Sequence, residues 1–241
     1  MKYDVSLELE NRNEEYSFGD VAKQANGSAW LKSGDTVILA TIVIDETEIV
    51  KDDFLPLTVQ YIEKTYAAGK IPGGFFKRET KPSDFETLTS RIVDRSLRPL
   101  FPKGFGHPTQ ITIMVFSAGE DADLQVLALN AASAALYTSD IDINTSVSAV
   151  RAAKIDGELV LNPTLTQLKN STLDLYLSGT KEDLLMIEMR SFGSNEMQIE
   201  DNYIIDPMID PAISAPSISM HTSNAIGEDE LISIFEGLMS L

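Results

Sequence analysis

The sequence predicts an α/β fold, and three observations lead to this class. Runs of β-branched and apolar residues of strand length recur along the chain, for example at 36–44, 111–116 and 173–177. Two longer stretches, 83–98 and 122–138, have the length and apolar spacing of helices. Strands and helices therefore alternate, as expected of a sheet with helices packed against it. With 43% hydrophobic residues, the chain has enough apolar material for a full core.

The first sixty residues predict strands and turns. A turn at 33–35 separates the apolar run 29–31 from the run 36–44. The second run is so uniformly apolar that we expect a strand buried on both faces. Residues 54–61 predict another strand.

A glycine-rich loop at 66–78 leads into the first predicted helix. Ser83 and Glu86 have the spacing of a capping box at its start, and the step from Arg98 to Pro99 predicts its end. Apolar side chains gather on one side of this helix and arginines on another. The apolar set is Leu88, Ile92 and Val93, and the basic set is Arg91, Arg95 and Arg98.

The second predicted helix, 122–138, is apolar nearly all round, so we expect it to be buried against a sheet. Short strands near 147–155 and 158–162 follow, joined by an Asp-Gly hairpin signal. Residues 191–227 are rich in Ser, Asn, Asp and Pro, which predicts an insertion or surface loop. A last amphipathic helix is expected near 228–239.

Composition excludes several classes of protein. The absence of cysteine excludes a disulfide framework, a thiolate metal site and a cysteine nucleophile. No stretch has the roughly 18 consecutive apolar residues that a membrane span needs. We therefore expect a cytoplasmic chain with no membrane partner.

The net charge of -18 argues against simple nucleic-acid binding, because an acidic protein repels a polyanion at long range. The charge is uneven, however, since residues 61–110 contain nine basic and five acidic side chains. A basic patch on an acidic chain suits a protein that binds a polyanion at one place. The alternative is that these bases lie on solvated helix faces.

Two adjacent segments, 66–79 and 88–102, resemble the signature of the first RNase PH-like core of bacterial polynucleotide phosphorylases. Weaker similarity extends from about residue 15 to 190. The resemblance implies an RNase PH-like β-α-β-α core with a mixed sheet and packed helices, formed by 1–241 as a single domain. It also implies that the polypeptide continues past Leu241 into a second core.

The same resemblance implies a function. Members of this family degrade single-stranded RNA from the 3′ end, using inorganic phosphate and Mg²⁺, and release nucleoside diphosphates. Three chains, each with two cores, form a ring around an RNA channel. The expected partners are thus single-stranded RNA, two further copies in a homotrimer, and components of an RNA degradosome.

Four residues of the loop are candidates for RNA contact. Phe75 and Phe76 precede Lys77 and Arg78, and aromatic rings beside cations can stack bases and neutralise phosphates without reading sequence. The resemblance places them at the constriction through which RNA threads. Lys77 stands where arginine is usual, so one planar donor group is lost but the charge remains. The alternative is that both phenylalanines are core residues behind a glycine turn.

The three helix arginines have two interpretations. Arg91, Arg95 and Arg98 form a stripe that could contact RNA phosphates. Equally, they could pair with Glu86, Asp94 or acids on a neighbouring strand.

The resemblance also identifies what this chain lacks. In the family's active core, a serine-rich loop holds phosphate, and an Asp-x5-Asp-x-Lys pattern supplies metal and acid–base groups. The corresponding loop here, 117–123, contains three carboxylates, which repel phosphate. The second pattern becomes Leu168, Asp174 and Tyr176. We therefore expect no catalytic residue and no metal ligand here, and assign Mg²⁺ and phosphate to the second core.

Three other functions remain open. The chain could be a self-sufficient RNase PH-type exonuclease, although the loop at 117–123 argues against it. It could be a stand-alone RNA-binding or ring scaffold with no enzymatic second core. An unrelated small-molecule α/β enzyme is the third, and the signature at 66–102 disfavours it.

Overall fold

A computed structural model describes residues 2–9, 11–50, 54–73 and 78–191. Its larger sheet has six strands in the order β1-β2-β3-β4-β6-β5. Among its described strands only β5 and β6 pair in parallel, so the sheet is mixed, as expected. The strands are β1 (Tyr3–Leu9), β2 (Arg12–Phe18), β3 (Gly27–Ser33), β4 (Thr36–Ile44), β5 (Leu57–Glu63) and β6 (Thr109–Ser117).

A smaller sheet has the order β10-β9-β7-β8. It consists of β7 (Ser148–Ile155), β8 (Glu158–Leu161), β9 (Leu173–Gly179) and β10 (Leu184–Ser191). The hairpin between β7 and β8 turns at Asp156 and Gly157, which have φ angles of 51° and 87°. Two successive left-handed residues are what a two-residue hairpin turn requires, so the Asp-Gly prediction is confirmed.

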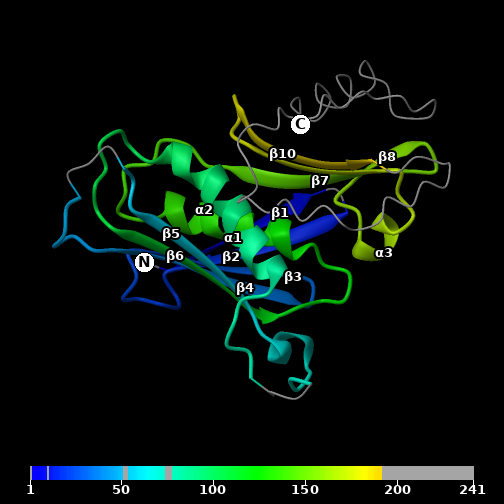
Figure 1. Ribbon diagram of the computed structural model, residues 1–241, viewed down its shortest axis with the longest axis horizontal. Coiled ribbons are helices and arrows are strands. Elements are labelled where there is room, and N and C mark those ends of the chain that lie inside the picture. The colour runs from blue at the N-terminus through cyan, green and yellow to red at the C-terminus, as the bar shows by residue number, and fades with distance from the viewer. Residues whose placement is uncertain (1, 10, 51–53, 74–77, 192–241) are drawn as a thin grey trace, which may run out of the picture. The chain divides into compact units, whose positions relative to one another are not determined.

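The two long helices lie between the sheets (Figure 1). Helix α2 packs against β3, β4 and β6 on one side and against β7 on the other, while α1 packs against β5 and α2. Among the described helices, none is long and apolar enough to cross a membrane. The helices are α1 (Asp84–Leu97), α2 (Leu124–Tyr137), the short α3 (Leu165–Leu168), and the 3-10 turns η1 (Thr65–Ala68) and η2 (Arg98–Leu100).

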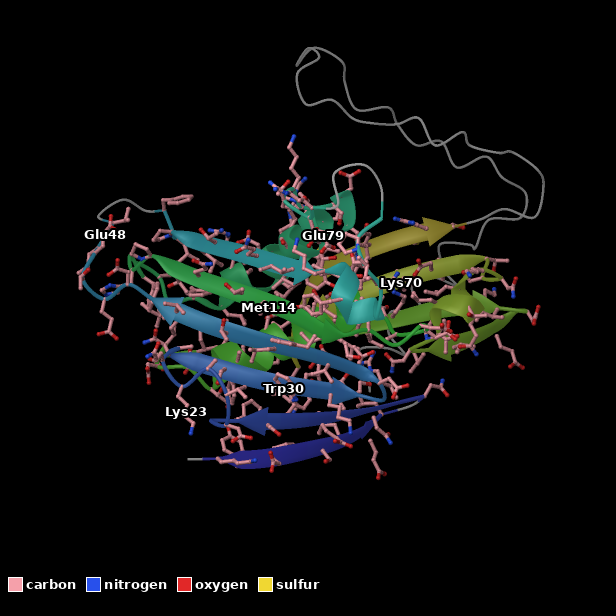
Figure 2. The ribbon with its side chains drawn as sticks, turned by 90° about the horizontal axis from the view of Figure 1, so that it is seen from below. Lys23, Trp30, Glu48, Lys70, Glu79 and Met114 are labelled. Carbon is pink, nitrogen blue, oxygen red and sulfur yellow. The ribbon has the colours of Figure 1, made fainter. Side chains whose placement is uncertain are left out.

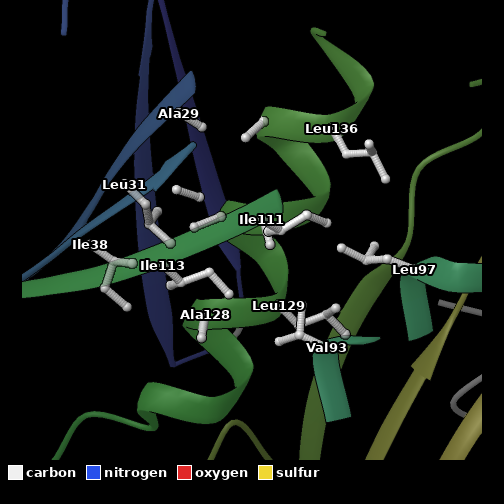
Figure 3. Packing of buried hydrophobic residues seen from close by; sticks show 14 of the residues in the cluster. Ala29, Leu31, Ile38, Val93, Leu97, Ile111, Ile113, Ala128, Leu129 and Leu136 are labelled. Atoms are coloured by element: carbon white, nitrogen blue, oxygen red, sulfur yellow. The ribbon is translucent and has the colours of Figure 1, made fainter. Parts of the chain in front are cut away.

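Small side chains let α2 approach the larger sheet closely. Ala128 and Leu129 are fully buried, and they pack with Ile111 and Ile113 of β6 in the core shown in Figure 3. A Cβ atom on Gly27 would lie 2.4 Å from the carbonyl oxygen of Ala135. Burial on all sides of α2 confirms the prediction from its composition.

The sheet differs from expectation in one respect. In β4, Ile38 and Ala40 are fully buried, whereas Val43 is 48% exposed. The expectation of burial on both faces is wrong, because α1 and α2 both lie on the same face of the larger sheet. Figure 2 looks onto the other face, where Trp30 and Met114 are labelled.

Helix α1 follows its predicted bounds but not its whole predicted apolar side. Ser83 accepts a hydrogen bond from the Glu86 amide, and the Glu86 carboxylate accepts one from the Ser83 amide, which confirms the capping box. Ile92 and Val93 are buried, but Leu88 is 48% exposed. The expected strand at 54–61 begins three residues later, at Leu57.

Candidate functional site

The glycine-rich loop has a stem that ties its two ends together. The Glu79 carboxylate accepts hydrogen bonds from the amide of Thr65, at 2.7 Å, and from the Thr65 hydroxyl. The Lys64 ammonium donates to the carbonyl oxygen of Glu79 at 3.2 Å. The two Thr65 hydrogen bonds, with the nearby Lys64 charge, hold the pKa of Glu79 below its usual range, so the carboxylate is ionised. Figure 2 shows Lys70 and Glu79 at this stem.

The stem is also fixed to the sheet. Ala67 is buried, and its carbonyl oxygen accepts from the amide of Ala118, just beyond β6, at 2.9 Å. Gly69 ends η1 with a left-handed φ of 65°, where a side chain would be strained. The described start of the loop is therefore anchored to the sheet.

Exposed cations are part of this loop. Lys70 and Arg78, which belong to the described parts of the loop, are both exposed. The other three candidates in the loop, Phe75, Phe76 and Lys77, lie outside the described residues.

The three helix arginines are not equivalent. Arg91 and Arg95 are exposed, and in the part of the chain that the structure describes neither has a carboxylate within 4.0 Å. Arg98 donates to Asp94 at 2.7 and 3.1 Å, and to the carbonyl oxygens of Leu55 and Leu57 at 3.0 and 3.3 Å. Of the three arginines, it is thus Arg98 that forms the ion pair with Asp94 given as one of the two interpretations. Arg98 also connects η2 to β5.

Among the described residues, Glu86 pairs with a lysine and with backbone amides and has no arginine partner. Besides capping α1, its carboxylate accepts from the amide of Glu63 at 2.9 Å and lies 3.8 Å from the Lys64 ammonium. Burial would raise the pKa of Glu86, but these hydrogen bonds and the Lys64 charge outweigh it and lower the pKa. The start of α1 is thereby fixed to the end of β5 and to the loop stem.

Two of the three carboxylates of the loop 117–123, those of Asp121 and Asp123, have structural partners. Asp121 accepts from the amide and hydroxyl of Thr166, at 3.2 and 2.6 Å, and so binds the start of α3. Asp123 caps α2, accepting from the amides of Gln125 and Val126 at 3.2 and 3.3 Å. A helix N-terminus attracts anions, and here a side chain of the protein itself fills that place.

Asp123 also belongs to a nearly buried cluster around Arg151 of β7, which we call the Arg151 centre. The guanidinium donates to Asp123, to both carboxylate oxygens of Asp174 at 2.9 and 3.0 Å, and to the side-chain oxygen of Gln125 at 2.8 Å. It lies over the ring of Tyr176, 5.6 Å from the ring centroid.

The Arg151 centre contains two of the three residues aligned with the family's Asp-x5-Asp-x-Lys pattern. Asp174 is engaged by Arg151, and Tyr176 is only 1% exposed. Burial raises the pKa of Tyr176 far above its usual value, so its hydroxyl stays protonated. The third residue, Leu168, has no group that could bind a metal. Arg151 itself was missed by the sequence reasoning, because nothing near it in the sequence indicates its partners.

The donor set does not fit a Mg²⁺ ion. Mg²⁺ needs free carboxylates in near-octahedral geometry, whereas Asp123 and Asp174 already share one guanidinium. In the described ranges, no group of three or more acidic or histidine side chains could hold a metal.

Comparisons with known proteins agree with the fold and with the resemblance. The model of the 3′ exoribonuclease family, domain 1, matches residues 10–142, and that of domain 2 matches 145–201. The crystal structure of rice (Oryza sativa) Rrp46 is similar with a TM-score of 0.56 at 17% identity, over 75% of this chain and 81% of that one. That likeness shows a shared fold.

Closely similar sequences exist among bacterial proteins. Over 234 residues the chain is 79% identical to the polyribonucleotide nucleotidyltransferase of Sulfurimonas denitrificans and 61% identical to that of Nitratiruptor sp.. Each match covers 97% of this chain, which spans 32% of the relative. The recognition made from the loop and helix signature is confirmed. Since the domain 1 match alone spans more than half of the 241 residues, the chain belongs to the 3′ exoribonuclease, or RNase PH, family.

Proposed function

We propose that this chain is the non-catalytic RNase PH-like half of a polyribonucleotide nucleotidyltransferase that degrades single-stranded RNA by phosphorolysis from the 3′ end. It forms part of a ring and guides RNA, while a second core binds Mg²⁺ and phosphate and carries out the reaction. Residues 1–241 form one RNase PH-like domain. The expected insertion or surface loop at 191–227, Ser191 apart, and the expected helix near 228–239 lie outside the described residues. The assembly is a cytoplasmic homotrimer that associates with RNA-degradosome components.

One observation carries the non-catalytic assignment. Phosphorolysis needs an anion pocket for inorganic phosphate and a metal to polarise the reacting linkage. At the corresponding place, the Asp123 side chain caps the N-terminus of α2. Arg151 donates hydrogen bonds to the carboxylates of Asp123 and Asp174. A phosphate ion there would meet carboxylates, and a metal ion would meet a guanidinium.

The RNA-binding part of the proposal rests on the exposed cations and the fixed loop stem. Arg78, Arg91 and Arg95 neutralise phosphates, and Phe75, Phe76 and Lys77 complete the contact with RNA. Base–aromatic stacking contributes about 1–3 kcal/mol per base, so the two phenylalanines dominate affinity at high salt. Arg98 acts differently from its neighbours, since its hydrogen bonds to Asp94 and to two backbone carbonyls leave it little freedom.

The test is single-stranded RNA binding as a function of salt. Replacing one phosphate contact in single-stranded RNA reduces the slope of log affinity against log salt by about 0.7. We expect Arg91→Ala and Arg95→Ala each to reduce the slope, and Phe75→Ala/Phe76→Ala to weaken binding with little change in slope. Arg190→Ala removes an exposed arginine outside the basic segment 61–110 and serves as the control. Equal effects of Arg91→Ala and Arg190→Ala would refute a specific RNA surface.

A second candidate function is a stand-alone RNA-binding or ring scaffold. The loop stem and the exposed arginines favour RNA binding in either case. Phosphate-dependent release of nucleoside diphosphates by the full-length polypeptide distinguishes the two functions. Half of a phosphorolytic enzyme belongs to a polypeptide that releases diphosphates, whereas a stand-alone scaffold does not.

A further inference from the structure

The Arg151 centre collects oxygen atoms in a way that is typical of a cation site. Four side-chain oxygens surround the guanidinium: one from Asp123, two from Asp174 and one from Gln125. Carboxylate and amide oxygens are the ligands that hard divalent cations such as Ca²⁺ and Mn²⁺ prefer. Here the cation they surround is part of the protein.

The centre joins three elements that are distant in sequence. Asp123 and Gln125 belong to the start of α2, Arg151 to β7 and Asp174 to β9. The side chains of Arg151, Asp123 and Asp174 are only 12%, 8% and 16% exposed. Nearly buried carboxylates need a positive partner, and removing that partner from a buried pair is strongly destabilising.

The geometry of the hydrogen bonds also explains why the cation of this centre is an arginine. Burial alone would lower the pKa of Arg151, but Asp123 and Asp174 outweigh it and raise the pKa, so the guanidinium stays charged. A planar guanidinium can donate in three directions at once, from Nε to Asp123, from one terminal nitrogen to Asp174 and from the other to Gln125. A lysine ammonium is a point charge on a flexible stem and would not make the same set of bonds.

We propose that Arg151 is the permanent cation of this centre and that its guanidinium takes the position a divalent cation would otherwise fill. Removing the guanidinium then turns the same oxygens into a divalent-cation site. The inference deepens the proposed function, on which it rests in part: the non-catalytic core stabilises this place without metal. Truncation at position 151 leaves a space between Asp123 and Asp174, with both charges uncompensated. A hydrated ion can then bridge them.

The experiment compares the 241-residue chain with Arg151→Ala, using Mn²⁺ as the probe. Thermal unfolding is followed by circular dichroism with Mn²⁺ and with a chelator, and bound Mn²⁺ is measured by electron paramagnetic resonance. We expect the melting temperature of the wild type to be the same in both conditions. Arg151→Ala should melt lower in chelator and recover progressively as Mn²⁺ is added, because a ligand that binds only the folded state stabilises it by mass action.

Two controls isolate the centre. Arg151→Ala/Asp174→Asn removes one of the two carboxylates, and its melting temperature should no longer respond to Mn²⁺. If Arg151→Ala does not fold in chelator, refolding it with Mn²⁺ present should restore the native spectrum.

Three results would overturn the proposal. The first is an Arg151→Ala variant whose melting temperature does not change when Mn²⁺ is added. The second is a wild type that Mn²⁺ stabilises as much as the variant. The third is a variant that fails to refold even with Mn²⁺. None of these measurements involves RNA or phosphorolysis, so failure here leaves the RNA-binding proposal standing, and failure of RNA binding leaves this one standing.

Discussion

Replacing Arg98 by alanine should destabilise the fold, while replacing Arg91 should not. Both belong to the same arginine stripe of the sequence, but their surroundings differ. Arg98 bonds Asp94 and the carbonyl oxygens of Leu55 and Leu57. Arg91 is exposed.

The size of the effect follows from these contacts. A half-exposed ion pair four residues apart on a helix contributes about 0.3–0.5 kcal/mol. Each hydrogen bond to a backbone carbonyl contributes about 1 kcal/mol, so Arg98→Ala should cost about 2–3 kcal/mol in the free energy of unfolding. For a domain of this size, that lowers the melting temperature by about 4–12 °C. An exposed side chain such as Arg91 should change stability by at most about 0.5 kcal/mol.

Thermal unfolding and salt-dependent RNA binding, measured on both variants, separate the two roles. We expect Arg98→Ala to lower the melting temperature and leave the salt slope of RNA binding unchanged. Arg91→Ala should do the reverse. An Arg98→Ala variant with wild-type stability and a reduced salt slope would refute this reasoning and place Arg98 among the RNA contacts.

Three further predictions follow from single sites. Glu79→Ala should weaken RNA binding without lowering the melting temperature, because it releases the loop stem at Thr65. Glu79→Gln keeps an acceptor oxygen and should retain most of the affinity. Equal loss of affinity in both variants would contradict the role of the stem. Gly27→Ala should lower the melting temperature by several degrees, since the new methyl group would meet the Ala135 carbonyl oxygen; an unchanged melting curve would show that α2 shifts freely. The depressed pKa of Glu86 means that its contribution to stability is fully present above the usual glutamate pKa of about 4.3 and is lost as the pH falls through the lower folded value. The difference in unfolding free energy between wild type and Glu86→Gln should therefore shrink below about pH 4, and a difference that is constant with pH would contradict this.

Local chemistry made much of the fold predictable. The capping box of Ser83 and Glu86, the Asp156-Gly157 turn and the uniformly apolar helix α2 each follow from neighbouring residues, and each is observed. The family signature likewise lies in two adjacent segments, 66–79 and 88–102, and the resemblance that they carry implied the mixed sheet.

The rest depended on contacts between distant segments. Arg151 is 28 residues from Asp123 and 23 from Asp174, and only the packing of α2, β7 and β9 brings the three together. The exposure of Leu88 and Val43 depends on which faces other elements cover, and residue spacing alone does not determine that. For the same reason, the sequence could not separate Arg98 from Arg91 and Arg95.

We infer that this RNase PH-like unit binds RNA without catalysing its phosphorolysis. The most direct measurement is phosphate-dependent release of nucleoside diphosphates from single-stranded RNA, with Mg²⁺, by the 241-residue chain and by the full-length polypeptide. We predict release by the full-length polypeptide only, with the short chain folded as judged by circular dichroism. Diphosphate release by the 241-residue chain itself would contradict the account, because Asp123, Arg151 and Asp174 would then have to belong to a working active site.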